Sequence, residues 1–289
     1  MIRMVLLIIL FMIMVFSVVA EVIGDRTGAP RRSNPVTELG KGITNSINNA
    51  DRLAPDFSSA LDRVEIKLPT LTAKKKSDEA PPMAMGDFSG QDFSGADHKE
   101  EIFAGSNVSN TIFTGALLDG AVFEGATGKN TNFDKARLAE ANFNAGVFSE
   151  AVFTGADLQK SVGRAGSFAE ADFSKADLSF AKFSGADLTG AKFDGGYAAG
   201  AIFIGATMKR ALLVDVDMRG VRFDNADLSK ADFTNTKVES AFFTGARLDG
   251  ANLSEAIGLQ PEQLAAACGD SSTRLPEGLT IAPCKDETL

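Results

Sequence analysis

The chain has 289 residues, a net charge of −9, 22 phenylalanines, no tryptophan, one histidine and two cysteines. With a single histidine and no HExxH, CxxC or GxxxxGK[ST] motif, the sequence gives no support to a zinc hydrolase, a histidine-based nucleophile relay or a phosphate-binding loop. We therefore expect a protein that is not an enzyme and has no catalytic, cofactor-binding or metal-binding residues.

An uncharged, apolar stretch follows Arg3 and extends from Met4 to Ala20. A basic start, an apolar run and a cleavage site with Val18 and Ala20 are typical of a secretory signal peptide. The run also approaches the length that spans a bilayer, so an uncleaved signal anchor stays open. For residues 1–20 we expect one of these two, and for the protein a location in the periplasm or on the inner membrane facing the periplasm.

Residues 21–85 change in composition and are expected to form a linker with short helices. One candidate helix begins near Pro35, and a second carries Phe57 and Leu61. We expect this segment to cover the open first edge of the structure that follows it, or to hold that structure away from a membrane.

Residues 86–256 follow a five-residue period. With few exceptions, a large apolar residue stands at every fifth position from Phe88 to Leu253, and a small residue, usually alanine, stands two positions before it. The two side chains lie on one face of an extended segment, but five is odd, so the chain must turn after each pair to keep the next pair on that face. The period fits neither a continuous helix nor a continuous strand and predicts a corner in every repeat.

We expect the corner two residues after each large residue, where glycine is frequent, as at Gly115 and Gly185. Lys135, Glu150 and Lys175 occupy the same position. The sequence therefore predicts that the corner does not always need a positive φ angle.

The large residues also alternate. Positions ending in 3 are mostly phenylalanine, and positions ending in 8 are mostly aliphatic. This alternation requires an even number of sides, and four sides give a square parallel β-helix solenoid of about eight coils around a column of side chains. The expected core ladder consists of Phe93, Phe113, Phe133, Phe153, Phe173, Phe183, Phe193, Phe203, Phe223 and Phe243.

The segments AlaAspPheSerLys (171–175) and SerGlyAlaAspLeuThrGly (184–190) resemble pentapeptide-repeat proteins. For residues 86–256 the resemblance implies an all-β fold, a right-handed quadrilateral β-helix with four pentapeptides in each coil. The members of this family share a shape and not a reaction, so the resemblance does not identify an activity.

Four inward positions lack a large apolar residue and hold His98, Gly128, Gly163 and Ala198. At the last three we expect an underpacked layer or a local bulge, caused by drift in a redundant array, with a ligand pocket as the alternative. The histidine belongs to the first, imperfect coil and is expected to be half-exposed at its edge.

Residues 257–289 are expected to form a C-terminal cap and a tail. The stretch from Pro261 to Cys268 predicts a short helix that ends at Gly269, with Leu259 and Leu264 closing the last coil.

The two cysteines, Cys268 and Cys284, both lie in this tail. Because an exported chain meets an oxidising compartment, we expect them to form a disulfide. The tail is also similar to the tails of pentapeptide-repeat proteins of the bacterial envelope.

Charge is distributed unevenly among the expected walls. The wall centred on Phe93, Phe113 and Phe133 has an excess of acidic residues, whereas the opposite wall is near neutral. The near-neutral wall also carries apolar residues at an outward position, namely Ile102, Val122, Val162, Ile202 and Phe242. We interpret these residues as a candidate interaction wall. Ordinary β-propensity on a solvent-facing wall is the alternative.

Together these observations predict a non-catalytic structural or protein-interaction module of the bacterial cell envelope. The expected partner is an unknown envelope protein or a second copy of the chain in a homodimer. We expect no binding to nucleic acid, and an N-terminal membrane anchor is one of the two alternatives for residues 1–20.

The alternative is a cytoplasmic protein that mimics DNA and binds topoisomerases, as the resemblance implies for some relatives. Duplex DNA carries one charge per ~1.7 Å, or roughly 24 charges over a rod of roughly 41 Å. This charge far exceeds the net charge of the chain, and the expected leader also disfavours the alternative.

Overall fold

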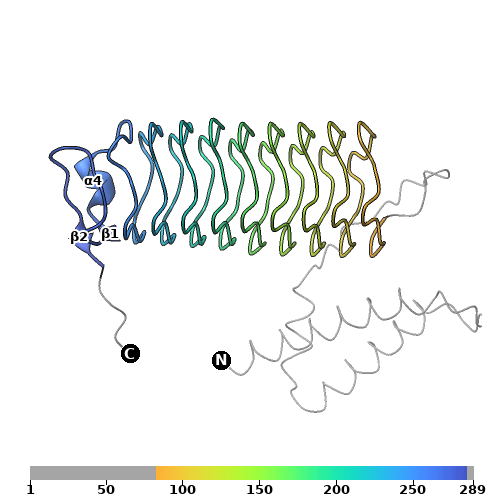
Figure 1. Cartoon of the computed structure of the whole chain (residues 1–289), viewed down its shortest axis with the longest axis horizontal. Coiled ribbons are helices and arrows are strands. Elements are labelled where there is room, and N and C mark those ends of the chain that lie inside the picture. The colour runs from red at the N-terminus through yellow and green to blue at the C-terminus, as the bar shows by residue number, and fades with distance from the viewer. Residues whose placement is uncertain (1–82, 285–289) are drawn as a thin grey trace, which may run out of the picture. The chain divides into compact units, whose positions relative to one another are not determined.

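The computed structural model describes residues 83–284. The expected leader, the linker up to residue 82 and residues 285–289 lie outside this range. The described residues form one stack of similar coils that ends in a small C-terminal element (Figure 1). No helix within 83–284 is both long enough and apolar enough to cross a bilayer.

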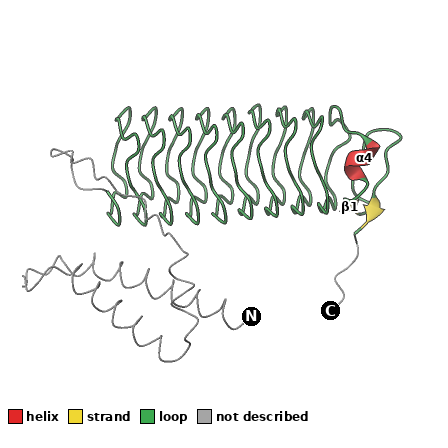
Figure 2. Cartoon of the chain, turned by 180° about the vertical axis from the view of Figure 1, so that it is seen from behind, coloured by secondary structure: helices red, strands yellow, loops and turns green. Residues whose placement is uncertain are grey.

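The coils are joined by parallel pairing between residues that are twenty positions apart. Asp172 pairs with Lys192, Asp177 with Tyr197, and Lys182 with Ile202. Four successive pentapeptides therefore make one turn of the helix, which confirms the expected square parallel β-helix. Each side contributes a single paired residue before the chain turns, so the coils are drawn as loops in Figure 2.

Backbone hydrogen bonds connect each coil to the next. The amide of Phe173 donates to the carbonyl of Lys192 at 2.7 Å, and the amide of Lys192 donates back to the carbonyl of Ala171 at 3.0 Å. A third bond closes each corner, as where the amide of Ala176 donates to the carbonyl of Phe173 at 3.0 Å.

The corner has a positive φ angle at every repeat from Met85 to Gly250, with values between 52° and 71°. The prediction that Lys135, Glu150 and Lys175 relax this requirement is wrong, because their φ angles are 55°, 60° and 60°. Each corner is a four-residue turn. Its third residue has a positive φ angle, and the amide of its fourth residue donates to the carbonyl of its first, which is the geometry of a type II turn.

The ladder of hydrogen bonds explains why residues other than glycine accept this conformation. The corner amide of Lys135 donates to the carbonyl of Thr154 at 2.9 Å, and that of Lys175 donates to Asp194 at 2.9 Å. A left-handed residue with a Cβ atom costs roughly 1–2 kcal/mol. Any other corner would break both this bond and the turn bond, and unsatisfied backbone groups cost about 1–3 kcal/mol each.

Glycine is needed where a side chain from the preceding coil lies across the corner. A Cβ atom on Gly200 would lie 2.8 Å from the Phe180 ring, and one on Gly105 would lie 3.1 Å from the Met85 sulfur. The side chain at one corner thus lies along the rod axis against the corner twenty residues later. The frequency of glycine reflects this contact as well as the φ angle.

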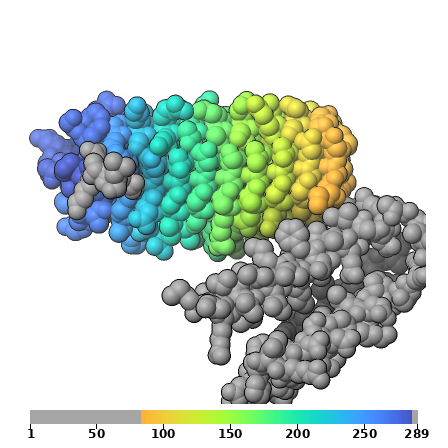
Figure 3. Space-filling view, turned by 90° about the horizontal axis from the view of Figure 1, so that it is seen from below, coloured from red at the N-terminus to blue at the C-terminus, as the bar shows by residue number. Residues whose placement is uncertain are grey.

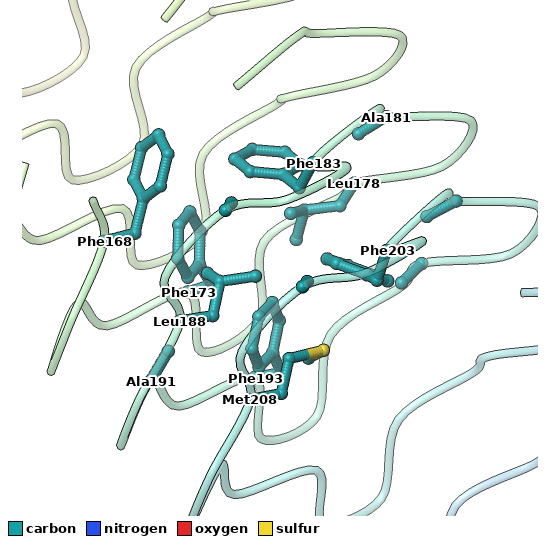
Figure 4. Packing of buried hydrophobic residues seen from close by; sticks show 14 of the residues in the cluster. Phe168, Phe173, Leu178, Ala181, Phe183, Leu188, Ala191, Phe193, Phe203 and Met208 are labelled. Carbon is teal, nitrogen blue, oxygen red and sulfur yellow. The ribbon is translucent and has the colours of Figure 1, made fainter. Parts of the chain in front are cut away.

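The core is a column of stacked rings and alanines. The expected ladder residues from Phe113 onward are at most 1 % exposed, while Phe93 in the first coil is partly buried. Within one wall the rings of Phe173 and Phe193 stack at 5.1 Å with 12° between their planes. Rings on opposite walls meet edge to face, as Phe173 and Phe183 do at 6.1 Å (Figure 4). The coils pack as continuous bands (Figure 3).

The gaps at Gly128 and Gly163 are filled, so the expected underpacked layers are absent from these two positions. A Cβ atom on Gly163 would lie 2.5 Å from the Phe183 ring and 3.0 Å from that of Phe168. At Gly128 the ring of Phe148, one coil further, occupies the space in the same way. Each missing side chain is replaced by a ring from a neighbouring position.

The layer at Ala198 differs from those at Gly128 and Gly163, because the backbone and not a ring comes close to the core. Ala198 is fully buried. Two residues before it, a Cβ atom on Gly196 would lie 2.9 Å from the carbonyl oxygens of Ala176 and Phe193. The backbone itself approaches the interior here, which only glycine allows.

The C-terminal cap begins with helix α4, Pro261–Leu264. The expectation that the helix reaches Cys268 is wrong. The chain enters the two-residue strand β1, Cys268–Gly269, which pairs in parallel with β2, Ala282–Pro283. The helix ends because the chain returns to the ladder, where the amide of Cys268 donates to the carbonyl of Ala246 at 3.0 Å. The side-chain amide of Gln263 donates to the carbonyls of Val238 and Ala241, at 2.8 and 2.7 Å. It thereby pairs the edge carbonyl of Ala241, which the backbone amide of a further regular coil would otherwise satisfy.

The cap adds one irregular layer to the stack. Cys268 pairs with Arg247 and Arg274 with Asn252, separations longer than the regular twenty residues. Leu264 and Leu259 are 2 % and 7 % exposed, so both close the last coil as the sequence predicts.

Cys268 and Cys284 form a disulfide with an S–S distance of 2.03 Å. The bond fastens the residue after β2 to the first residue of β1, where the amide of Cys284 also donates to the carbonyl of Gly269 at 3.2 Å.

We predict that Gly163→Phe, which completes the phenylalanine column, destabilises the protein. Its ring would occupy the space of Phe168 and Phe183, and overpacking of this kind costs ~1–3 kcal/mol. The urea midpoint of unfolding measures the effect. The double variant Gly163→Phe with Phe168→Leu frees part of the space and should recover stability, and a single variant as stable as the parent would contradict the packing.

Asp270 in the cap provides a second prediction. The hydroxyl of Ser272 and the amides of Gly250 and Ser272 donate to its carboxylate and lower its pKa to about 2, against a smaller opposing effect of desolvation. Because the folded-state pKa lies below the ordinary value of 3.8, the carboxylate stabilises the cap above pH 4 and loses this effect between pH 4 and 2.

We therefore expect amide exchange at Gly250 and Ser272 to accelerate relative to the core as the pH falls through this range. Asp270→Asn keeps an acceptor but does not titrate, so its protection relative to the core should not change with pH. Equal pH dependence in both proteins would contradict the assignment.

Candidate interaction surfaces

The outer surface is organised in rows that run along the rod. The residue before each large residue points outward and pairs with its counterpart in the next coil, so each wall presents one row of side chains. Neighbouring members of a row are separated by the inter-strand spacing of about 4.8 Å. Because the core column fills the interior, these rows and the corners form the outer surface along the coils.

Aspartates in these rows are part of the corners. The carboxylates of Asp172 and Asp177 each accept the amide two residues later, from Ser174 and Ser179, at 2.9 Å. Such a side chain replaces water as the partner of the turn amide. This role of the aspartates was not predicted from the sequence. The recurring pattern of Asp or Asn two residues before Ser or Thr is the signal that identifies it.

The same contact changes the acidity of several carboxyl groups. In Asp87 and Asp92, hydrogen bonds from Ser89 and Ser94 lower the pKa. Asp194 on the acidic wall is an exception, because burial raises its pKa and the nearby Asp172 and Asp232 add to the shift.

The candidate interaction wall is less continuous than the sequence suggests. Its row places three polar residues, Asn142, Lys182 and Arg222, between the expected apolar ones, in the order Ile102, Val122, Asn142, Val162, Lys182, Ile202, Arg222, Phe242. Ile102 and Phe242 are 42 % and 51 % exposed, whereas the apolar residues between them, Val122, Val162 and Ile202, are half-buried. The five apolar residues of the candidate interaction wall therefore do not form a continuous stripe. The row is a mixed row of apolar and polar residues. Reading every twentieth residue of the sequence, from Ile102 onward, gives the same order.

Two exposed aromatic residues lie on another wall and were not identified from the sequence as surface features. Tyr197 is 57 % exposed and Phe180 is 61 % exposed. They belong to successive coils, and the Phe180 ring lies against Gly200 at the end of the segment GlyTyrAlaAlaGly, 196–200. An aromatic residue at an outward row position or at a corner is the sequence signal for such a face.

A hollow of about 350 Å³ lies beside Tyr197. It is lined by Gly195, Gly196, Tyr197, Asp215, Val216, Asp217, Asn235, Lys237 and Ile257.

A second hollow, of about 510 Å³, contains four basic residues, Lys209, Arg210, Lys230 and Arg247. Most of these cations have an acidic partner, such as Asp227 at 3.1 Å from Lys209 and Asp249 beside Arg247. This hollow therefore has little uncompensated positive charge.

His98 lies in the aromatic end of the first coil. Its ring contacts Phe93 and Phe103 edge to face, at 5.1 and 5.8 Å between centroids, and the residue is half-buried. This placement agrees with the expected edge position.

The family model described as "Pentapeptide repeats" matches the chain in eight copies, over residues 109–144, 131–161, 164–195, 197–229 and 226–257. No curated protein sequence matches the chain.

Among solved structures, trypsin-treated QnrB1, a plasmid-mediated fluoroquinolone resistance protein, is similar over 65 % of this chain and 90 % of its own, with 18 % identity and a TM-score of 0.52. HetL from the cyanobacterium Nostoc, a protein involved in heterocyst differentiation regulation, matches over 68 % of this chain and 86 % of its own, with 20 % identity and a TM-score of 0.24. At 18 % identity the likeness to QnrB1 shows that the fold is shared and nothing more.

Proposed function

We propose a function from one established premise: the chain belongs to the pentapeptide-repeat family. Its fold is accordingly the right-handed quadrilateral β-helix of that family, which generally serves structural or interaction roles rather than catalysis. We propose that the protein is a non-catalytic structural or protein-interaction module of the bacterial cell envelope that acts through the walls of its β-helix.

The observation that carries this proposal is the closed interior. The coils stack on one another, and the inward phenylalanines from Phe113 onward are almost completely buried. A molecule that binds the described coils therefore meets the outward rows and the corners, which are held rigidly by the ladder. Rigid, regularly spaced side chains suit recognition of an extended surface on a partner.

We favour the mixed row from Ile102 to Phe242 as the contact. It combines exposed apolar ends with Lys182 and Arg222, so it fits a partner surface that is apolar and carries carboxylates. A second copy of the chain offers such a surface on its acidic wall, which includes Asp172 and Asp232. An envelope protein with the same chemistry is the other candidate.

The proposed location rests on the sequence of residues 1–20, which lie outside the described residues. A signal peptide would release the protein into the periplasm, and a signal anchor would hold it on the inner membrane facing the periplasm.

We expect Ile202→Lys combined with Phe242→Lys to leave folding intact and to reduce self-association or partner capture at least tenfold. Both residues are on the surface, and lysine replaces apolar contact with a charge that must be desolvated. Affinity capture from intact envelopes and analytical ultracentrifugation measure the two outcomes.

The matched control adds the same charge to another wall through Val147→Lys combined with Thr207→Lys, and it should behave as the parent protein does. If both double variants capture and associate like the parent, the mixed row is not the contact and the proposal for this wall is wrong.

The alternative, a DNA-mimicking topoisomerase-binding protein, is favoured only by the likeness of fold to QnrB1. Its surface argues against it, because carboxylates alternate with cations in ion pairs such as Arg137–Asp119 at 2.9 Å and Lys129–Glu150 at 3.1 Å. Inhibition of a topoisomerase by the purified protein, together with a cytosolic location on cell fractionation, would support the alternative and overturn the envelope proposal.

A further inference from the structure

The hollow beside Tyr197 extends over four successive coils at a corner of the rod. Its lining residues come from the segments 195–197, 215–217 and 235–237 and from Ile257. At an inter-strand spacing of about 4.8 Å, the four coils extend roughly 14 Å along the rod. The volume of about 350 Å³ lies within the range of small-molecule sites, roughly 300–1,000 Å³.

The hollow coincides with local departures from the repeat. Gly195 contributes no side chain at the corner, and at the inward position after it Gly196 lies close to the carbonyl oxygens of Ala176 and Phe193. In the next coil a valine, Val216, occupies the inward position that usually holds alanine. The backbone bond from Asp217 to Gly196 is 3.2 Å long, compared with 2.9 Å for the equivalent bond from Asp177 to Ala156.

The groups around the hollow combine one aromatic face with several polar groups. Tyr197 is 57 % exposed and Ile257 is 44 % exposed, while Asp215, Asn235 and Lys237 supply a carboxylate, an amide and an ammonium. A sugar ring has an apolar C–H face that packs on an aromatic ring, and its hydroxyl groups both donate and accept hydrogen bonds.

The charge balance favours a neutral ligand. The two carboxylates of the hollow, Asp215 and Asp217, are balanced by Lys237 and by Arg219, which donates to Asp217 at 2.9 and 2.6 Å. A strongly anionic or cationic ligand would find no excess of opposite charge here, whereas a polyhydroxylated ligand would find both donors and acceptors.

A second aromatic side chain extends the same wall. Phe180 lies against Gly200, at the opposite corner of the pentapeptide that contains Tyr197, and only Ala198 and Ala199 stand between them. Ala198 points inward and is buried, so Ala199 is the one residue between Tyr197 and Gly200 that lies on the surface, and its side chain is small. A chain of several sugar units can lie across it, with units next to both rings.

We propose that this face binds a neutral oligosaccharide, with Tyr197 as the stacking platform, Asp215, Asn235 and Lys237 as hydrogen-bonding groups, and Phe180 as a platform for a further sugar unit. This inference goes beyond the proposed function, because it needs no protein partner and involves a different wall from the mixed row.

The chain contains one tyrosine and no tryptophan, so its tyrosine emission reports on Tyr197 alone. We would titrate the full-length protein, in a detergent without a sugar headgroup, with chitotetraose, cellotetraose and their disaccharides. We expect a saturable change in emission with at least one tetrasaccharide, at a dissociation constant of roughly 1 mM or lower, and at least tenfold weaker binding of the matching disaccharide.

Variants separate the roles of the residues. Asn235→Ala should weaken binding of both lengths at least fivefold, and Phe180→Ser should weaken the tetrasaccharide but not the disaccharide. Tyr197→Ala, followed by calorimetry, should abolish binding. Phe242→Ser removes an exposed aromatic from another wall and should bind like the parent.

Absence of a saturable response to all probes up to 10-fold above this concentration would overturn the proposal. So would binding that is unchanged in Asn235→Ala, Phe180→Ser and Tyr197→Ala. Capture of a protein that depends on Tyr197, without binding of any saccharide, would assign the face to a protein partner and would also overturn it. None of these results bears on self-association through the mixed row, so the two proposals fail independently.

Discussion

The hydrogen-bond ladder between coils is the constraint on which the rest of the structure depends. Each pentapeptide donates to and accepts from the coils twenty residues away, and the corner residue takes part through its own amide, as Lys175 does with Asp194. The ladder thereby imposes one backbone conformation on every corner, whatever the residue. This explains how lysine, glutamate and phenylalanine occupy a left-handed conformation that they would rarely adopt alone.

Once the ladder fixes the backbone, the side chains divide into three independent sets. The inward pairs fill the column and have little freedom, as the tightly stacked Phe153 and Phe173 show, with ring centroids 4.8 Å apart. The corners need glycine only where the preceding coil lies across them. The outward rows need an acceptor for the turn amide in many repeats, but otherwise they vary freely. Recognition can therefore change along the walls without disturbing the core.

Much of this fold could be predicted because its determinants are periodic. The alternation of Ala171 and Phe173 with Ala176 and Leu178 encodes inward pairs, corners and four sides, and the structure confirms each. The compensation at Gly163 could not be predicted, because it depends on how the rings of Phe183 in the next coil and Phe168 on the adjacent wall turn into the gap. The uniform corner conformation was missed because intrinsic φ preferences are weaker than two backbone hydrogen bonds.

The candidate site was predicted less well. A row is defined by residues twenty positions apart, and reading at that interval separates Val162 from Ile202 by Lys182. The hollow beside Tyr197 lies where Gly196 and Val216 replace the usual alanines, and a periodic pattern does not tell whether such departures open a hollow on the surface. The cap was predicted in position but not in form, because the chain leaves the helix early to pair Cys268 with the last coil. Those expectations that concern residues 1–82 lie outside the described residues.

The twenty-residue coil has a consequence for how such a chain can change in length. Duplicating four consecutive pentapeptides inserts one full turn, so every later residue keeps its wall, its neighbours and its place in the stack. Duplicating a single pentapeptide rotates everything beyond it by a quarter turn, which moves aromatic residues into aliphatic columns and transfers each binding face to an adjacent side. Lengthening by whole turns therefore conserves the surface pattern, whereas insertion of one unit rearranges all of it at once.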